Sequence, residues 1–198
     1  MAFDSRLGET IKAYDALAAE YADEWFYRPL SPQMELFTSF LPAGAKVLDA
    51  GGGHGRDSAE LSKKGFEPCL LDLSAGLLAE ARRRNAAVCS IQGDVRSLPF
   101  SNSSFDGIWA CASLVHLERR EIRGAFLEMA RVASRRGVLF VSLRLGDGEG
   151  WEEWRGFRRF YTYVRPEEAL NMMKEGGWEV RWWTEEAPHW FSAIGIRQ

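Results

Sequence analysis

The chain has 198 residues, of which 46% are apolar, and this is enough for one domain with a sizeable core. Its formal net charge of −3 argues against a surface that is basic all over and binds nucleic acid through this charge. The N-terminal stretch carries acidic side chains and no apolar run, so we expect no signal peptide. No stretch approaches the roughly 18 uncharged apolar residues of a membrane helix, so we expect no membrane partner.

The three cysteines, Cys69, Cys89 and Cys111, stand singly in apolar surroundings. No CxxC pair indicates a metal site, and an odd, sparse count argues against a disulfide framework. We therefore expect no bound metal and a reducing, cytoplasmic setting.

The first forty residues are expected to form a helical cap. Apolar residues recur at helical spacing over 5–28, and the sequence "RPLSP" ends that pattern. A second, short helix is expected over 32–40. We therefore treat 1–40 as an N-terminal cap on the domain.

The central part of the chain alternates strands with helices. Short apolar runs predict strands within 41–50, 67–73, 86–92, 105–114 and 137–145. Amphipathic segments predict helices over 55–64, 75–85 and 117–133. Such alternation indicates an α/β fold with a doubly wound, mostly parallel sheet, whose core is 41–145.

The C-terminal part, 167–198, breaks this alternation. A helix is expected over 165–178, with Pro166 near its start. Two strands, 178–183 and 189–196, then follow one another around a short turn that contains Pro188. Such a hairpin predicts one antiparallel strand at or near the edge of the sheet, within a single domain of 1–198.

A glycine-rich loop, in "VLDAGGGHGRDSAEL" (47–61), follows the first strand of the core. A dinucleotide loop would read GxGxxG, but Arg56 stands where its third glycine is required. The GK[ST] of a triphosphate-binding loop is also missing. The loop therefore favours a ligand other than a nucleotide phosphate.

Three carboxylates, Asp49, Asp72 and Asp94, fall at the ends of successive strands. In an open parallel sheet, ligands bind beyond these carboxyl ends. The carboxylates would repel phosphates and attract a cofactor with a cationic group, a ribose diol and an adenine amine. Asp72 suits the diol and Asp94 the amine, while Asp49 either touches the cofactor or caps the loop amides.

These motifs together resemble the class I S-adenosylmethionine-dependent methyltransferases. "VLDAGGGHG" is similar to the first motif of that family, "LLDLS" to its second, and "GDVRSLPFSNSSFDGIWA" to its adenine-binding segment. "FLEMARVASRRGVLFVS" resembles the helix and strand that follow. The resemblance covers about residues 40–145 and implies a seven-stranded Rossmann-like fold with a closing antiparallel strand.

The resemblance implies S-adenosylmethionine as methyl donor, with S-adenosylhomocysteine as product. It places Gly51 and Gly53 on the methionine part, Asp72 on the ribose, and Leu73, Asp94 and Val95 around the adenine. The other residues it assigns to the cofactor are Tyr14, Tyr21, Asp49, Ala110 and Cys111.

Two positions depart from the pattern of the family. Gly52 stands where a bulkier residue or a cysteine is usual, and this change should leave cofactor binding intact. The sequence "SRRG" replaces the usual Pro-Gly-Gly turn before the fifth strand, which should only alter the turn.

Two residues near the end of the fourth strand raise the question of a dedicated catalytic group. His116 is a weak candidate for a general base toward a hydroxyl acceptor, or else a residue that only packs. Cys111 lacks the Pro-Cys dipeptide of cytosine methylation, so we expect a small core residue rather than a nucleophile.

The segment 146–166 interleaves aromatic residues with arginines. One interpretation is a substrate-side insert that recognises a planar or anionic acceptor by stacking and charge. The others are binding of single-stranded nucleic acid and simple packing of a hairpin. The residues we expect on the substrate side are His116, Trp151, Trp154, Arg158 and Tyr161.

The hypothesis that the sequence favours is a methyltransferase acting on a small molecule. A tRNA or other RNA methyltransferase is the second hypothesis, and a non-catalytic binder of S-adenosylmethionine is the third. The Asn/Asp-Pro-Pro-Tyr motif of adenine methylation is absent after the fourth strand, and no Tyr-x-x-x-Lys pair indicates a short-chain dehydrogenase.

Overall fold

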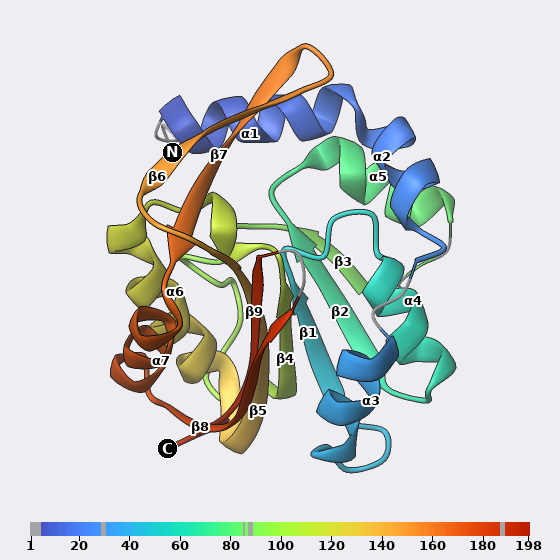
Figure 1. Cartoon of the computed structure of the whole chain (residues 1–198). Helices are drawn as coiled ribbons and strands as arrows, with labels where there is room; N and C mark the ends of the chain where they lie inside the picture. The colour runs from blue at the N-terminus through green and yellow to red at the C-terminus, as the bar shows by residue number, and fades with distance from the viewer. Residues whose placement is uncertain (1–4, 29–30, 85, 87–88, 187–188) are drawn as a thin grey trace.

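A computed structural model describes residues 5–28, 31–84, 86, 89–186 and 189–198 (Figure 1). Its central sheet has the order β3-β2-β1-β4-β5, and neighbouring strands in this part are parallel. The strands are β1 (Lys46–Ala50), β2 (Glu67–Asp72), β3 (Cys89–Gln92), β4 (Phe105–Cys111) and β5 (Ala133–Leu145). The predicted α/β fold with a mostly parallel sheet is therefore confirmed.

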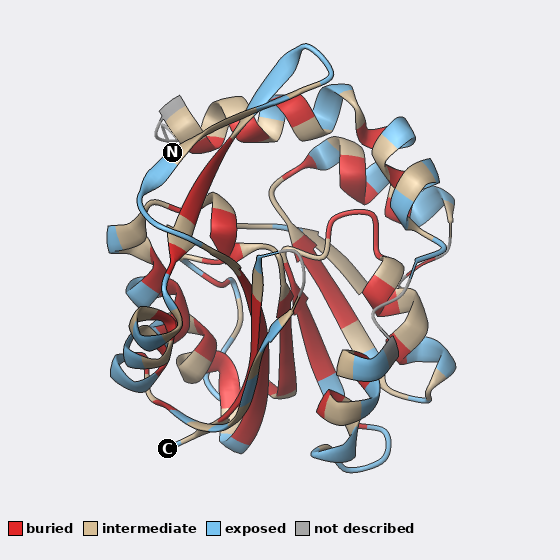
Figure 2. Ribbon diagram, viewed as in Figure 1, coloured by how far each residue is buried: buried red, intermediate tan, exposed pale blue. Residues whose placement is uncertain are grey.

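Helices pack on both faces of this sheet. Successive side chains of each strand point to opposite faces, so both faces present apolar side chains for helices to cover. Leu48 of β1 joins the core cluster that includes α6 (Arg119–Val132) and α7 (Pro166–Glu175). Its neighbour Val47 joins the cluster that includes α3 (Ser31–Ser39) and α4 (Arg56–Lys63). Figure 2 shows the buried strands between these two helical layers.

The second cluster contains a stacked pair of aromatic rings. Trp109 of β4 stacks on Phe140 of β5 with ring centroids 3.9 Å apart, and both side chains are fully buried. Burying a side chain of this size contributes about 1.5–3 kcal/mol to stability. A smaller cluster, with Leu70 and Leu78 at its centre, seats α5 (Ala75–Arg83) against β2.

The C-terminal hairpin forms as expected. β9 (Trp190–Arg197) pairs antiparallel with β5, and β8 (Trp178–Glu186) pairs antiparallel with β9. The predicted turn with Pro188 lies outside the described residues, as do positions 87–88 of the predicted third strand and residue 85 of the predicted second core helix. The described part of the third strand begins at Cys89.

The segment 146–166 adds two strands to the expected seven. β6 (Glu149–Trp154) and β7 (Phe157–Val164) form an antiparallel hairpin, so the described residues contain nine strands in one sheet. β7 joins the end of β5 in parallel over two positions, at Arg144 and Leu145. The tip of the hairpin is exposed (Figure 2).

The N-terminal cap contains three helices where two were expected, because the segment 5–28 is divided into two. α1 (Ser5–Ala16) and α2 (Ala18–Trp25) are separated at Leu17, whose φ of −114° and ψ of 23° depart from helical values. α1 lies beside the β6–β7 hairpin across one end of the sheet (Figure 1), and the Phe160 amide donates to the Thr10 hydroxyl over 3.0 Å.

The expectation that the cysteines stay unpaired is wrong. Cys69 and Cys89 occupy one register position of β2 and β3, with Cα atoms 4.7 Å apart, and form a disulfide, while Cys111 is free. Parallel neighbouring strands bring such positions within disulfide reach whatever their separation in sequence. With this disulfide, the cysteines no longer indicate a reducing compartment.

None of the helices in the described ranges has the length and apolar character needed to cross a membrane.

Candidate functional site

A cavity of about 560 Å³ opens beyond the carboxyl ends of the parallel strands. Its lining comes from the loops after β1, β2 and β4, from the ends of β5 and β9, from the β6–β7 hairpin and from the N-terminal helices. The strand order reverses between β1 and β4, so the cavity lies at the topological switch point where open α/β sheets bind ligands.

The glycine loop forms one wall of this cavity. Gly51, Gly53 and Gly55 have φ values of 74°, 55° and 77°, a region that only glycine adopts freely. The Gly51 amide donates to the Leu71 carbonyl over 2.7 Å, which ties the loop to β2. A Cβ at Gly51 would lie 2.3 Å from the Ser113 Cβ, so the close approach of the two loops also requires glycine there.

Asp49 is buried beside Gly52 of this loop and is not among the residues that line the cavity. Its carboxylate is 1% exposed and accepts a hydrogen bond of 2.6 Å from the Ser58 hydroxyl. Burial, reinforced by the nearby charge of Asp57, raises the pKa of Asp49 to about 7. A Cβ at Gly52 would lie 2.3 Å from the Asp49 carboxyl carbon, so glycine at that departure from the family pattern makes room for the buried aspartate.

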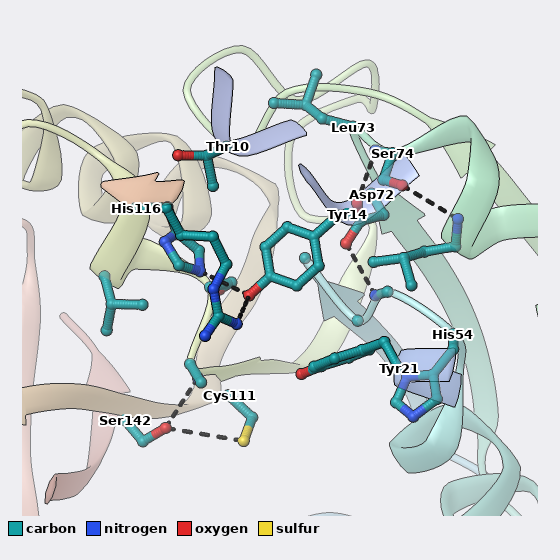
Figure 3. A pocket seen from close by; sticks show the side chains of 18 of the residues that line it. Thr10, Tyr14, Tyr21, His54, Asp72, Leu73, Ser74, Cys111, His116 and Ser142 are labelled. Atoms are coloured by element: carbon teal, nitrogen blue, oxygen red, sulfur yellow. Dashed lines mark hydrogen bonds between the residues drawn. The ribbon is translucent and has the colours of Figure 1, made fainter. Parts of the chain in front are cut away.

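Asp72 lies at the end of β2 and faces the cavity (Figure 3). One carboxylate oxygen accepts from the Ser74 amide and the other from the Gly53 amide, each over 2.8 Å. Burial raises the pKa of Asp72 to about 6, against the opposing effect of these amide donors. Each oxygen keeps a lone pair for a further donor. Leu73 lines the cavity beside it.

Asp94, predicted to contact the adenine, is not among the residues that line the cavity, so that contact stays a prediction. Its carboxylate is occupied by Arg96, which donates from Nε over 3.0 Å and from Nη2 over 2.7 Å. Arg96 also pairs with Glu121 of α6. The neighbours Gly93 and Val95 do line the cavity, so only the Val95 part of this expectation is placed there.

The end of β4 places one of its two predicted residues in the cavity. Cys111 lines it, whereas Ala110 is fully buried in the core, because successive side chains of a strand point to opposite faces. Burial raises the pKa of the Cys111 thiol to about 12, so this cysteine stays protonated at neutral pH. A thiol is a poor nucleophile, in agreement with a packing role.

Tyr14 and Tyr21 both enter the cavity from the N-terminal helices. Their ring centroids are 5.3 Å apart, edge to face, and the Tyr21 ring lies 5.3 Å from that of His54 in the glycine loop. Figure 3 shows the two tyrosines between Asp72 and Leu73 on one side and His116 and Cys111 on the other.

His116 is held in one tautomer by its two partners. Its Nδ1 lies 2.7 Å from the Phe160 carbonyl, which only accepts, so Nδ1 carries the proton. Its Nε2, 3.0 Å from the Tyr14 hydroxyl, therefore accepts from that hydroxyl. The Tyr14 oxygen in turn accepts from Nη1 of Arg159 over 3.2 Å. Burial lowers the pKa of His116 to about 4, so the ring is neutral at neutral pH.

The β6–β7 hairpin brings only part of its predicted set to the cavity. Trp154 and Tyr161 line it, but Trp151 and Arg158 do not. Arg158 lies outside, where it pairs with Glu9 over 2.7 Å and stacks 4.3 Å from the Trp151 ring centre. Trp151 and Arg158 therefore lie away from the cavity, where they were not expected. Because side chains alternate along a strand, Arg159 faces the cavity and its neighbour Arg158 faces away.

Sequence reasoning missed several residues that line the cavity. Among them are His54, Arg56, Asp57, Arg144 and Arg159. Asp57 is buried and accepts two hydrogen bonds from Arg56 and one, over 2.8 Å, from the Trp109 indole. Had β7 been predicted as a strand, its alternation would have indicated that Arg159 faces the cavity. No motif in the sequence pairs Asp57 with Trp109.

Comparisons with known proteins agree with this geometry. A family described as "Methyltransferase domain" matches residues 47–137. The chain is 35% identical over 138 residues to a malonyl-[acyl-carrier protein] O-methyltransferase of Enterobacter lignolyticus. This match covers 66% of this chain and 54% of that protein. It is 34% identical over 99 residues to a demethylmenaquinone methyltransferase of Renibacterium salmoninarum. This second match covers 50% of this chain and 41% of that protein.

A solved structure extends the likeness to the whole fold. It is the Burkholderia thailandensis 1,6-didemethyltoxoflavin-N1-methyltransferase, with bound 1,6-didemethyltoxoflavin and S-adenosylhomocysteine. The TM-score is 0.80 at 18% identity, and the match covers 100% of this chain and 92% of that one. Fold and site thus define a Rossmann-like methyltransferase domain. Residues 47–137 match the methyltransferase-domain family, and both curated relatives are methyltransferases, of whose length the chain spans about half.

The residues of the cavity fit the methyl donor of this family. Space beside the glycine loop depends on the absence of Cβ atoms at its glycines. The buried Nε2 of His54 and Oγ of Ser113 have no hydrogen-bond partner in the described residues. Asp72 offers acceptors for a diol. Across the described positions, no three His, Cys, Asp or Glu side chains gather as a metal site would require.

Proposed function

We propose that this chain transfers a methyl group from S-adenosylmethionine to a small-molecule acceptor. The observation that carries the proposal is a single cavity in which Asp72 and the glycine loop meet an aromatic, arginine-containing wall. The relatives support the activity: one is named for an acyl-carrier-protein substrate and another for a quinone precursor. Because the chain spans only part of those relatives, their acceptors do not transfer with the fold.

We propose that the cofactor lies along the ends of β1, β2 and β3. Asp72 would hold the ribose hydroxyls, and Leu73, Gly93 and Val95 would surround the adenine. The amides of the glycine loop, at the N-terminal end of α4, would receive the carboxylate of the methionine part. Cys111 and Ser113, at the end of β4, would then lie near the sulfonium.

The transfer itself is an in-line displacement: an acceptor lone pair bonds to the methyl carbon while the electrons of the carbon–sulfur bond pass to sulfur. The chain's contribution is to hold the two reactants in line and to exclude water, which supplies much of the acceleration in such reactions. Tyr14, Tyr21 and Trp154 are placed to form the apolar walls around the acceptor.

We propose that an acceptor proton leaves through Tyr14 and His116. Nε2 of His116 already accepts from the Tyr14 hydroxyl, so His116 reaches the acceptor only through that hydroxyl. The Tyr14 oxygen would take the proton from the acceptor while its own proton moves to Nε2. The Phe160 carbonyl, which accepts from Nδ1, would offset part of the cost of burying the imidazolium, which the low pKa of His116 makes short-lived.

The proposal is tested by incubating the protein with methyl-labelled S-adenosylmethionine and a fractionated cell extract. We expect the label to enter small molecules, and an Asp72→Asn variant to lose most of this transfer. Label in RNA would replace the small-molecule acceptor with the RNA alternative. Tight cofactor binding with no transfer to any fraction would contradict an enzymatic role.

A further inference from the structure

The cavity is divided electrically into two halves. The half formed by the glycine loop, the start of α4 and the end of β2 contains Asp72 and the ion pair of Arg56 with Asp57, with Asp49 buried behind it. The half formed by the end of β5 and the start of β7 contains Arg144 and Arg159. The methyl donor, a sulfonium, is suited to the acidic half, so the basic half is left for the acceptor.

Arg159 differs from the other arginines around the hairpin because it has no carboxylate partner in the described residues. Arg155 pairs with Glu24 over 2.9 Å, Arg158 with Glu9 over 2.7 Å, and Arg144 with Glu152 over 2.9 Å. Arg159 instead donates from Nη1 to the Tyr14 hydroxyl over 3.2 Å. Its charge is thus uncompensated by any aspartate or glutamate that the structure describes.

The edge of the Arg159 guanidinium that is left without an acceptor is the one that binds carboxylates elsewhere in this chain. Arg56 holds Asp57 through Nε and Nη2, and Arg158 holds Glu9 through the same two atoms. In Arg159 the buried Nε has no acceptor in the described part of the chain, and no hydrogen bond from Nη2 is formed there. This fork matches two carboxylate oxygens.

Aromatic rings surround this guanidinium. Its central carbon lies 4.2 Å from the Trp154 ring centre and 5.5 Å from those of Tyr14 and Tyr161. Contacts of this kind pre-organise an arginine, so that less conformational freedom is lost when it binds. All three rings also line the cavity, so a planar ligand would meet aromatic side chains beside the cation.

Arg144 supplies a second donor close by. Its guanidinium stacks 5.2 Å from the Tyr161 ring centre, so both arginines contact the same tyrosine. One terminal nitrogen of Arg144 is engaged by Glu152, and its buried Nε has no partner in the described residues. The acceptor half therefore offers unfilled N–H donors from two side chains.

We propose that Arg159 is the anchoring residue for a carboxylate group of a planar methyl acceptor. This inference rests on the proposed methyl transfer, and it adds the substrate class. The carboxylate would bind Nε and Nη2 of Arg159, and the planar body would lie among Trp154, Tyr14 and Tyr161. The anchored end of the acceptor thereby sets which atom of the acceptor faces the cofactor.

The test uses calorimetric titration of the full chain, saturated with S-adenosylhomocysteine, with three aromatic acids and their neutral amides. The pairs are benzoate and benzamide, indole-3-carboxylate and its amide, and 1-naphthoate and its amide. Arg159→Met removes the charge and keeps the length of the side chain. Arg158→Met is the matched control, because the neighbouring residue lies outside the cavity and pairs with Glu9.

We expect at least one acid to bind about tenfold or more tightly than its amide, a difference that Arg159→Met abolishes and Arg158→Met keeps. Affinity for S-adenosylhomocysteine should change less than about threefold in both variants, and circular dichroism should show both folded. No preference for any acid over its amide, or a preference that survives Arg159→Met, would overturn the inference.

A loss of cofactor affinity in Arg159→Met would also overturn it, because Arg159 would then serve the carboxylate of the cofactor. The two proposals fail separately in this design. Failure of S-adenosylhomocysteine to bind the wild-type chain contradicts the proposed methyl transfer, whereas normal cofactor binding without acid selectivity contradicts only the role of Arg159.

Discussion

At the scale of single residues, Asp72 links the sheet, the loop and the ligand. Its two oxygens accept the amides of Gly53 and Ser74, so it fixes the glycine loop and the start of α5 at once. Ser74 caps α5 by accepting from the Leu77 amide over 3.1 Å. A change at this residue therefore acts on binding and on the shape of the cavity.

The raised pKa of Asp72, about 6, makes cofactor affinity depend on pH. Ribose hydroxyls donate to the ionised carboxylate, so affinity for S-adenosylhomocysteine should weaken as pH falls through about 6. The stability of the unliganded chain responds with the opposite sign. A raised pKa means that the contribution of Asp72 is present at low pH and is lost as pH rises through about 6.

Asp72→Asn should weaken S-adenosylhomocysteine binding about tenfold at neutral pH and flatten its dependence on pH between about 5 and 7.5. Asparagine keeps the shape of the side chain but has one acceptor oxygen and no charge. Calorimetry at several pH values measures both effects. Unchanged affinity in a folded variant would remove Asp72 from the ribose site.

Tyr14→Phe tests the proton path, since it removes the hydroxyl between His116 and Arg159 and keeps the ring. We expect kcat for an acceptor that must lose a proton to fall at least tenfold, because general-base catalysis contributes about 10²–10⁴-fold. Cofactor affinity should stay within about threefold. An unchanged kcat would leave Tyr14 as a wall of the cavity and nothing more.

Among single residues, the motifs located several positions of the cavity. Asp72, Leu73, Tyr14 and Cys111, which the resemblance assigned to the cofactor, all line it, and their contacts with the cofactor stay predictions. Asp94 does not line it, because Arg96, two positions on, folds back onto its carboxylate. Such an ion pair depends on side-chain rotamers, which a motif match does not contain.

At the scale of elements, strand alternation in the β6–β7 hairpin separates residues that the sequence grouped together. Trp154 contacts the cavity, and its hairpin neighbour Trp151 packs outside against Phe160 and Arg158. A segment read without its strand register shows only that aromatic and basic residues are abundant. The register, which fixes the face of each residue, follows from pairing with β6 and β5.

Trp154→Ala should raise the KM for the acceptor about tenfold or more and change cofactor affinity little. The side chain stacks on Arg159 and contacts both tyrosines of the cavity, so its loss frees the guanidinium and opens the wall. Steady-state kinetics with labelled cofactor measure the split. Trp151→Ala is the control, and equal effects of the two variants would mean that the hairpin acts only by packing.

At the scale of the whole molecule, the parallel core followed from the alternation of apolar runs with amphipathic segments. The sequence missed two features that depend on long-range pairing. One is the disulfide between Cys69 and Cys89, which neighbouring strands bring together across 20 residues. The other is the pairing of β7 with β5. A hairpin over 146–166 was one of the open interpretations, but not that it extends the sheet beyond the expected seven strands and carries Arg159 over the cavity.

The division of one cavity between donor and acceptor is the central claim, and a crystal structure of the chain with S-adenosylhomocysteine tests it most directly. We predict the ribose hydroxyls on Asp72, the sulfur near Cys111 and Ser113, and open space between the sulfur and Arg159. The ligand lying on Arg159 and Arg144, or away from the glycine loop, would contradict the account.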